Sequence, residues 1–201
     1  TRELRRQPAF QYTPILILTG SVSQELARDA LQAGVTEMFR KQDIGELIHF
    51  MHRFLARHQP LQGRVLYVED NLSQQQAMHA QLTARGLRVD GFPSADEAWR
   101  HFLENDYDLV VTDIVLDGRM SGSRFVNRIR RQAGAHGDVP ILAVTAFDSP
   151  ARRIELFHLG VSDYVVKPVL PEELYTRVRS LISTKQIADR DRRLQDLVEQ
   201  S

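Results

Sequence analysis

The sequence contains no cysteine, which excludes disulfide bonds and thiolate chemistry. Basic and acidic side chains are balanced at 26 each, so no net field favours nucleic acid, and we expect no direct nucleic-acid binding. No apolar run approaches the ~20 residues that a membrane-spanning helix needs. We therefore expect no membrane insertion and, with cysteine absent, a cytoplasmic location. The sequence is 42% hydrophobic and 26% charged, which is typical of a globular protein.

Four segments have the pattern of strands buried on both faces of a parallel sheet, because their apolar residues follow one another without alternation. They lie within RVLYVEDN at residues 64–71, DLVVT at 108–112, PILAVTAF at 140–147 and DYVVKP at 163–168. Polar residues follow these strands: Glu69 and Asp70, Asp113, Thr145 and Lys167. Open α/β sheets bind ligands at the carboxyl ends of their strands. The sequence therefore predicts a site with three carboxylates, one hydroxyl and one ammonium.

This set of side chains has a chemical interpretation. Three carboxylates repel one another unless a hard cation lies among them, and Mg²⁺ prefers a few carboxylates while leaving positions for water and phosphate oxygens. One carboxylate can instead attack phosphorus and form an acyl phosphate. The metal ion, Lys167 and Thr145 would then neutralise and orient the phosphoryl oxygens.

In these features the sequence resembles the receiver domains of bacterial two-component response regulators, the CheY-like family, over residues 62–185. The resemblance implies that Asp113 accepts the phosphoryl group and that Mg²⁺ is held by Glu69, Asp70, Asp113 and the backbone carbonyl of Val115. It also implies phosphoryl contacts from Thr145 and Lys167, a switch formed by Thr145 and Tyr164, and a cis peptide at Lys167-Pro168. The loop DGRMSG at residues 117–122 departs from the family, which more often has a proline in a shorter turn.

The resemblance implies a phosphorelay switch that is not an enzyme. A sensor histidine kinase or a phosphotransfer protein would phosphorylate it. Phosphorylation would alter the face formed by the fourth helix, fifth strand and fifth helix. A homodimer could form through that face or through the C-terminal helix.

Two alternatives remain. A pseudo-receiver would serve only for interaction or dimerisation. Such a role would not require the intact set of site residues that the sequence contains. A phosphatase of the haloacid dehalogenase type would need a second aspartate two residues beyond its nucleophile. That position holds Val115, and Asp117 comes four residues after Asp113.

Helix signals separate the predicted strands. Asn71, Ser94 and Ser149 precede helical segments as N-caps, and Gly160 ends the helix that begins after Ser149. Strand and helix alternate, which predicts an α/β fold with a doubly wound, five-stranded parallel sheet in the flavodoxin-like order 2-1-3-4-5. We interpret Trp99 as a core residue. The basic run that contains Arg128, Arg130 and Arg131 is interpreted as a solvated face.

Residues 1–60 repeat the second half of this pattern. PILILTG at residues 14–20 resembles PILAVTA at 140–146, and AGVTEMFRK at 33–41 resembles LGVSDYVVK at 159–167. Thr19 and Thr145, Gly34 and Gly160, and Lys41 and Lys167 are each separated by 126 positions. We therefore expect a second, truncated receiver copy. Met38 and Gln42 take the places of Tyr164 and Pro168, which suggests a degenerate copy.

The sequence thus predicts three parts. Residues 1–60 are the C-terminal half of a first receiver, residues 61–185 are a complete receiver, and residues 186–201 are a helical linker to an output domain. In the last part, the residues of a broken apolar stripe favour pairing in a coiled coil; they are Ile187, Leu194, Leu197 and Val198. Tandem receivers followed by a charged helix also resemble receiver-regulated diguanylate cyclases.

Overall fold

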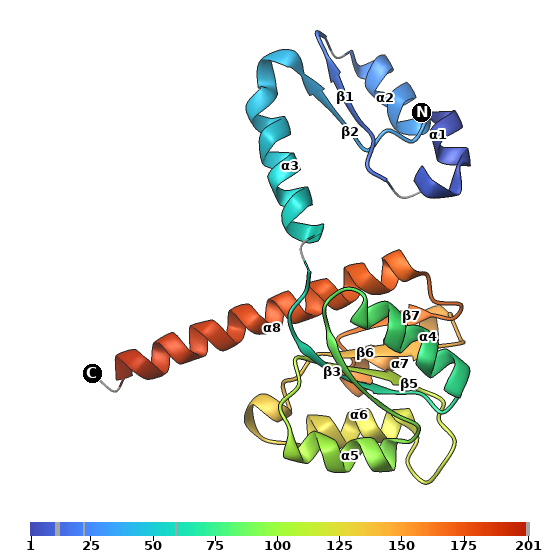
Figure 1. The fold of residues 1–201 in the computed structure, drawn as a ribbon, viewed down its shortest axis with the longest axis vertical. Coiled ribbons are helices and arrows are strands. Elements are labelled where there is room, and N and C mark those ends of the chain that lie inside the picture. The colour runs from blue at the N-terminus through green and yellow to red at the C-terminus, as the bar shows by residue number, and fades with distance from the viewer. Residues whose placement is uncertain (11–12, 22, 59, 200–201) are drawn as a thin grey trace. The chain divides into compact units, whose positions relative to one another are not determined.

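The computed structural model describes residues 1–201 except 11–12, 22, 59 and 200–201; the side chains of residues 9, 55–58 and 198–199 also lie outside the description. The chain consists of two compact units, Thr1–Gln59 and Pro60–Ser201 (Figure 1). Within the described part of the chain, no helix combines the length and apolar character needed to cross a membrane.

The second unit is built around a fully parallel sheet of five strands. These are β3 (Arg64–Val68), β4 (Arg88–Phe92), β5 (Leu109–Asp113), β6 (Ile141–Thr145) and β7 (Asp163–Val166). Their order in the sheet is β4-β3-β5-β6-β7, which confirms the predicted order 2-1-3-4-5. Every residue of β5 and β6 is buried, as their unbroken apolar runs predicted.

Helices cover both faces of this sheet (Figure 1). They are α4 (Leu72–Thr83), α5 (Ala95–Glu104), α6 (Gly122–Arg130), α7 (Pro150–Leu159) and α8 (Pro171–Glu199), with a short 3-10 helix at Gly134–His136. Apolar residues of α5, α6 and α7 form one core with the sheet, and those of α4 and α8 form the other. Trp99 lies in the first core and is 8% exposed, which confirms its predicted burial.

The predicted helix boundaries follow from capping contacts. Asn71, Ser94 and Ser149 each accept a hydrogen bond from the backbone amide three residues later, at 3.1, 3.3 and 3.2 Å. Such a cap contributes about 1 kcal/mol to helix stability. Gly160 ends α7 with a left-handed backbone at φ 100°. A side chain would be strained in that conformation.

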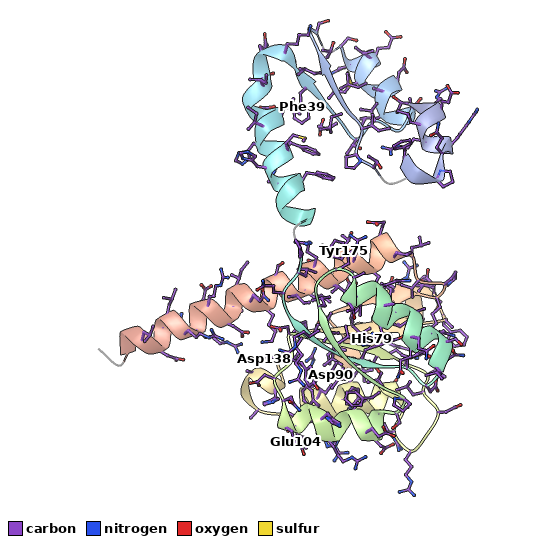
Figure 2. The ribbon with its side chains drawn as sticks, in the orientation of Figure 1. Phe39, His79, Asp90, Glu104, Asp138 and Tyr175 are labelled. Carbon is purple, nitrogen blue, oxygen red and sulfur yellow. The ribbon has the colours of Figure 1, made fainter. Side chains whose placement is uncertain are left out.

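Helix α8 runs without a break for 29 residues, from the predicted receiver into the segment that we predicted as a helical linker. Its first part buries Leu174, Val178 and Ile182 against the sheet. Two polar contacts hold the part beyond residue 185. Gln186 Nε2 donates to the carbonyl of Gln62 at 2.7 Å, and Arg192 pairs with Asp138, labelled in Figure 2, at 2.9 Å.

The first unit contains a two-stranded parallel sheet, formed by β1 (Leu16–Thr19) and β2 (Glu37–Arg40). Its α-helices are α1 (Arg2–Arg6), α2 (Gln24–Gln32) and α3 (Ile44–His58), and 3-10 helices lie at Pro8–Phe10 and Lys41–Asp43. Phe39 is buried, and its ring packs edge-on against Phe50 with centroids 5.6 Å apart (Figure 2). The element order β1-α2-β2-α3 repeats that of β6-α7-β7-α8.

Candidate functional site

Four strand ends of the second unit carry the polar residues that the sequence pointed to. Glu69 follows β3, Asp113 ends β5, Thr145 ends β6 and Lys167 follows β7. Glu69, Asp113 and Thr145 are buried, with 1%, 6% and 0% of their surface exposed. Side chains that combine polarity with such burial need specific partners, because an unpaired buried charge is costly.

The Lys167 ammonium lies between the two buried carboxylates. Its Nζ atom donates to Glu69 Oε2 at 2.8 Å and to Asp113 Oδ2 at 2.5 Å. Burial by itself would lower the pKa of Lys167, but the hydrogen bonds and charges of Asp113 and Glu69 outweigh it and raise that pKa above its ordinary value. Lys167 is therefore a cation at neutral pH and compensates both carboxylates.

Backbone amides hold the remaining carboxylate oxygens. Asp113 Oδ1 accepts a hydrogen bond from the amide of Val115 at 2.8 Å, and Glu69 Oε1 accepts one from Asn71 at 3.2 Å. The hydroxyl of Tyr67 lies 3.5 Å from Glu69 Oε2. Burial, followed by the charges of Glu69 and Asp113, raises the pKa of Tyr67. The orientation of both acids is thus fixed in advance of any reaction.

The loop after Asp113 is held at three points. The amide of Asp117 donates to Asp70 Oδ2 at 2.7 Å, and the amide of Met120 donates to Asp96 Oδ2 at 3.2 Å. At Gly122 a Cβ atom would lie 1.9 Å from the carbonyl oxygen of Asp113, so only glycine fits there. These contacts fix the loop, in which the sequence lacks the proline common in similar proteins.

The predicted switch residues, Thr145 and Tyr164, lie on neighbouring strands. Thr145 Oγ1 accepts from the amide of Phe147 at 3.1 Å and lies 3.3 Å from its carbonyl oxygen. The half-buried ring of Tyr164 packs edge-on against Phe157 with centroids 6.0 Å apart. The Lys167-Pro168 peptide bond, which follows β7, is cis.

The acids at this site suit a hard divalent cation in kind, because carboxylate and carbonyl oxygens are the donors that Mg²⁺ prefers. Their arrangement is less complete. Among the described residues, no group of three or more His, Cys, Asp or Glu side chains is placed to hold a metal ion. Glu69 and Asp113 share the ammonium of Lys167, while the exposed carboxylate of Asp70 accepts from the Asp117 amide. The donor chemistry therefore fits Mg²⁺, with two carboxylates adjacent and the third engaged by the loop.

Arg130 is the residue that the sequence analysis interpreted wrongly. It is half-buried and does not lie on a solvated face: Nε donates to the carbonyl of Gly160 at 2.7 Å, and Nη1 donates to those of Gly137 and Val139, both at 2.7 Å. Burial lowers its pKa. Arg130 thereby joins the segment before β6 to the end of α7, which supports the strand that ends at Thr145.

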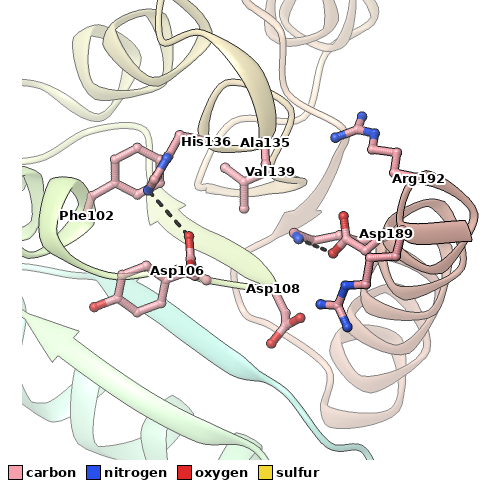
Figure 3. A pocket seen from close by; sticks show the side chains of 11 residues that line it. Phe102, Asp106, Asp108, Ala135, His136, Val139, Asp189 and Arg192 are labelled. Carbon is pink, nitrogen blue, oxygen red and sulfur yellow. Dashed lines mark hydrogen bonds and ion pairs between the residues drawn. The ribbon is translucent and has the colours of Figure 1, made fainter. Parts of the chain in front are cut away.

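A separate hollow of ≈ 340 Å³ lies at the opposite, amino-terminal ends of the strands (Figure 3). His136 Nε2 lies 3.6 Å from Asp106 Oδ1 on one side of it. Lys185 pairs with Asp189 at 2.5 Å on the α8 side. None of the predicted site residues lines this hollow. It therefore has no part in the candidate site.

Comparison with known proteins points to the same part of the chain. Residues 65–179 match the family described as the response regulator receiver domain. The transcriptional regulatory protein ResD of Bacillus subtilis is 30% identical over 119 residues, 59% of this chain and 48% of that protein. The regulatory protein VanRB of Enterococcus faecalis is 35% identical over 119 residues, 59% of this chain and 52% of that protein.

Solved structures agree with this match. The chemotaxis response regulator CheY4 of Vibrio cholerae is 27% identical with a TM-score of 0.56, and the alignment covers 60% of this chain and 99% of that one. The chain spans about half the length of the curated relatives that it matches.

Proposed function

The chain belongs to the family of response regulator receiver domains, and we propose that Asp113 is the residue on which it accepts a phosphoryl group. The donor would be a sensor histidine kinase or a phosphotransfer protein. One structural observation supports this proposal most strongly. The buried carboxylate of Asp113, at the end of the central strand β5, shares the Lys167 ammonium with Glu69.

The proposed step is an in-line transfer. An oxygen of Asp113 forms a bond to phosphorus while the bond between phosphorus and the donor atom breaks, and the donor keeps the electron pair. Lys167 moves from compensating a carboxylate to contacting a phosphoryl oxygen. Mg²⁺, held by Glu69, Asp70, Asp113 and the carbonyl of Val115, would supply positive charge to the other phosphoryl oxygens. The amide of Val115, which donates to Asp113 Oδ1, keeps the nucleophile oriented.

We propose that Thr145 and Tyr164 transmit the signal. The Thr145 hydroxyl, which contacts the backbone of Phe147, would turn to a phosphoryl oxygen and leave space for the Tyr164 ring. The face formed by α7, β7 and α8 would change with it and could form a homodimer. Through α8 the change would reach an output domain. A diguanylate cyclase is one such domain, and an assay of cyclic-di-GMP synthesis by the full-length protein tests it.

Residues 1–60 are, we propose, the second half of a further receiver copy. The hydrogen bonds of Arg130 recur there: Arg5 Nε donates to the carbonyl of Gly34 at 2.9 Å. The amide of Ile15 donates to Thr36 Oγ1 at 3.0 Å, and 126 positions later the amide of Ile141 donates to Ser162 Oγ at 3.0 Å. Residues 61–185 would be the complete receiver and residues 186–201 the linker. The first copy would not switch, because Met38 takes the place of Tyr164.

The phosphoacceptor proposal is tested by incubation with acetyl phosphate and Mg²⁺, followed by measurement of intact mass. The wild-type chain should gain one phosphoryl group, and Asp113→Asn should gain none. Asp117→Asn is the matched control, since Asp117 is an exposed aspartate four residues away, and it should be labelled like the wild type. Chelation of Mg²⁺ should abolish labelling. Undiminished labelling of Asp113→Asn would refute the assignment.

A further inference from the structure

One side of α6 carries a stripe of arginine residues beside the phosphoacceptor loop. Arg124, Arg128 and Arg131 are spaced at i, i+4 and i+7, which places their side chains on one side of the helix. Arg119 joins them from the loop that follows Asp113. Together with Asp96, Met120 and Asn127, the four arginines line a hollow of ≈ 500 Å³. We call this the arginine hollow.

The guanidinium groups at the arginine hollow have no carboxylate partner. None of the four forms an ion pair within the part of the chain that the structure describes. Six other arginines of the same unit do pair with a carboxylate, namely Arg64, Arg85, Arg152, Arg153, Arg177 and Arg192. Other arginines of this unit, such as Arg88, Arg100 and Arg190, also form no ion pair among the described residues, so the four are distinguished by lining one hollow.

Two contacts order side chains that line the arginine hollow. The guanidinium carbon of Arg128 lies 4.4 Å from the centroid of the Trp99 ring, which fixes one cation by a cation–π interaction. Asp96 is the carboxylate among the lining residues, and its Oδ2 atom accepts from the amide of Met120 at 3.2 Å. The carboxylate of Asp96 therefore holds the loop at Met120. Four guanidinium groups outnumber this one carboxylate, so the lining has a net positive charge.

We propose that the arginine hollow binds an acidic segment of a partner protein in an extended conformation. Four helical residues rise by ~6 Å, which matches the ~6.6 Å between alternate residues of an extended chain. Alternate carboxylates can therefore meet Arg124 and Arg128 in succession, and each guanidinium can donate two parallel hydrogen bonds to a carboxylate. Trp99 is 8% exposed and offers no platform for a nucleobase, which disfavours a nucleotide. The surface lies on α6, apart from the α7, β7 and α8 face.

The test uses a fluorescein-labelled decapeptide of alternating glutamate and serine, with binding to the whole chain followed by fluorescence anisotropy at low salt. The triple variant Arg124→Gln, Arg128→Gln, Arg131→Gln should bind at least tenfold more weakly than the wild type, a loss of ~1.4 kcal/mol. The matched control replaces three exposed arginines on β4, α5 and α8: Arg88→Gln, Arg100→Gln, Arg190→Gln. It removes the same charge and should bind within about twofold of the wild type.

Several results would overturn the proposal. One is equal weakening in both triple variants, which would show attraction to net charge alone. Another is tighter binding of an oligothymidylate or of inorganic triphosphate than of the peptide, which would assign the hollow to phosphate-bearing ligands. Affinity that does not fall between ~0.05 and ~0.3 M salt would exclude ion pairing at this exposed surface. Thermal unfolding of each variant shows that its fold is retained.

Discussion

The Nζ atom of Lys167 lies 2.5 Å from Asp113 Oδ2 and 2.8 Å from Glu69 Oε2, so one ammonium compensates two carboxylates that are almost completely buried. Lys167 follows β7, Asp113 ends β5 and Glu69 follows β3, and the parallel sheet brings these strand ends together. Unpaired buried charges are destabilising by several kcal/mol. The same contact therefore links the stability of the fold to the chemistry of the site.

Removal of this ammonium should destabilise the protein. Lys167→Met leaves Glu69 and Asp113 without a cation, and we expect the free energy of unfolding to fall by about 3 kcal/mol in urea titrations at neutral pH. Arg192→Met is the matched control. It breaks an exposed pair with Asp138, which should cost at most ~1 kcal/mol.

A second substitution separates charge from packing. In Lys167→Met with Glu69→Gln, one buried charge is gone, so the double variant should be more stable than Lys167→Met alone. Equal stability of the single and double variants would show that lost packing, and not uncompensated charge, accounts for the effect.

Stability should fall at alkaline pH. The folded state raises the pKa of Tyr67, through burial first and then the charges of Glu69 and Asp113, above its ordinary value of 10.0. Above pH ~10 the unfolded chain releases a proton that the folded chain retains, so the free energy of unfolding decreases as pH rises, by up to ~1.4 kcal/mol per pH unit for one group. Lys167, whose pKa is also raised, acts in the same direction.

Tyr67→Phe removes one of these groups. Its free energy of unfolding should decline less steeply than that of the wild type between pH ~10 and ~11, and the two should run parallel below pH ~9. Urea titrations at each pH measure this. Parallel curves across the whole range would mean that Tyr67 has no raised pKa.

The central strands were predictable because their sequences are unambiguous. Residues 109–112 and 141–144 are unbroken runs of apolar or β-branched residues, and the structure buries every residue of β5 and β6. The edge strand β4 gave no comparable signal, since it includes Arg88, Asp90 and Gly91 and is only partly buried. The topology implied a strand there without locating its residues.

Other features depend on tertiary contacts that no local pattern encodes. The inward direction of Arg130 is set by the carbonyls of Gly137, Val139 and Gly160, which lie up to 30 residues away along the chain. Its neighbours Arg128 and Arg131 are exposed, so composition alone cannot distinguish the three. Likewise, the engagement of Asp70 by the Asp117 amide joins residues 47 positions apart.

Tyr164 should transmit the effect of phosphorylation, but phosphorylation itself should not need this residue. The ring packs against that of Phe157, with centroids 6.0 Å apart, and the carboxylate of Asp113 is held by Val115 and Lys167 instead, so Tyr164→Ala should leave phosphorylation by acetyl phosphate nearly intact. Phosphate-dependent dimerisation or partner binding should weaken, which light scattering with and without acetyl phosphate can measure. Loss of phosphorylation itself would contradict this division of roles.

The phosphorylated state should be long-lived for a receiver domain. In a chain phosphorylated on Asp113, Val115 and Phe147 would flank the approach of water to the acyl phosphate, and the two residues are 56% and 62% exposed. Neither can orient water by a side-chain hydrogen bond, and Phe147 can cover the phosphate. Val115→Asn and Phe147→Glu should therefore accelerate dephosphorylation of the labelled chain. Unchanged or slower loss of phosphate would show that water access at these positions does not set the lifetime.

The most direct measurement locates the phosphoryl group itself. Borohydride reduces an aspartyl phosphate to homoserine, so the chain can be labelled with acetyl phosphate and Mg²⁺, reduced, digested and sequenced by mass spectrometry. We predict homoserine at position 113 in the wild type and at no other aspartate, and none when Mg²⁺ is chelated before labelling. Homoserine at Asp70 or Asp117, or its absence from position 113 in a chain that has gained a phosphoryl group, would contradict the assignment of Asp113.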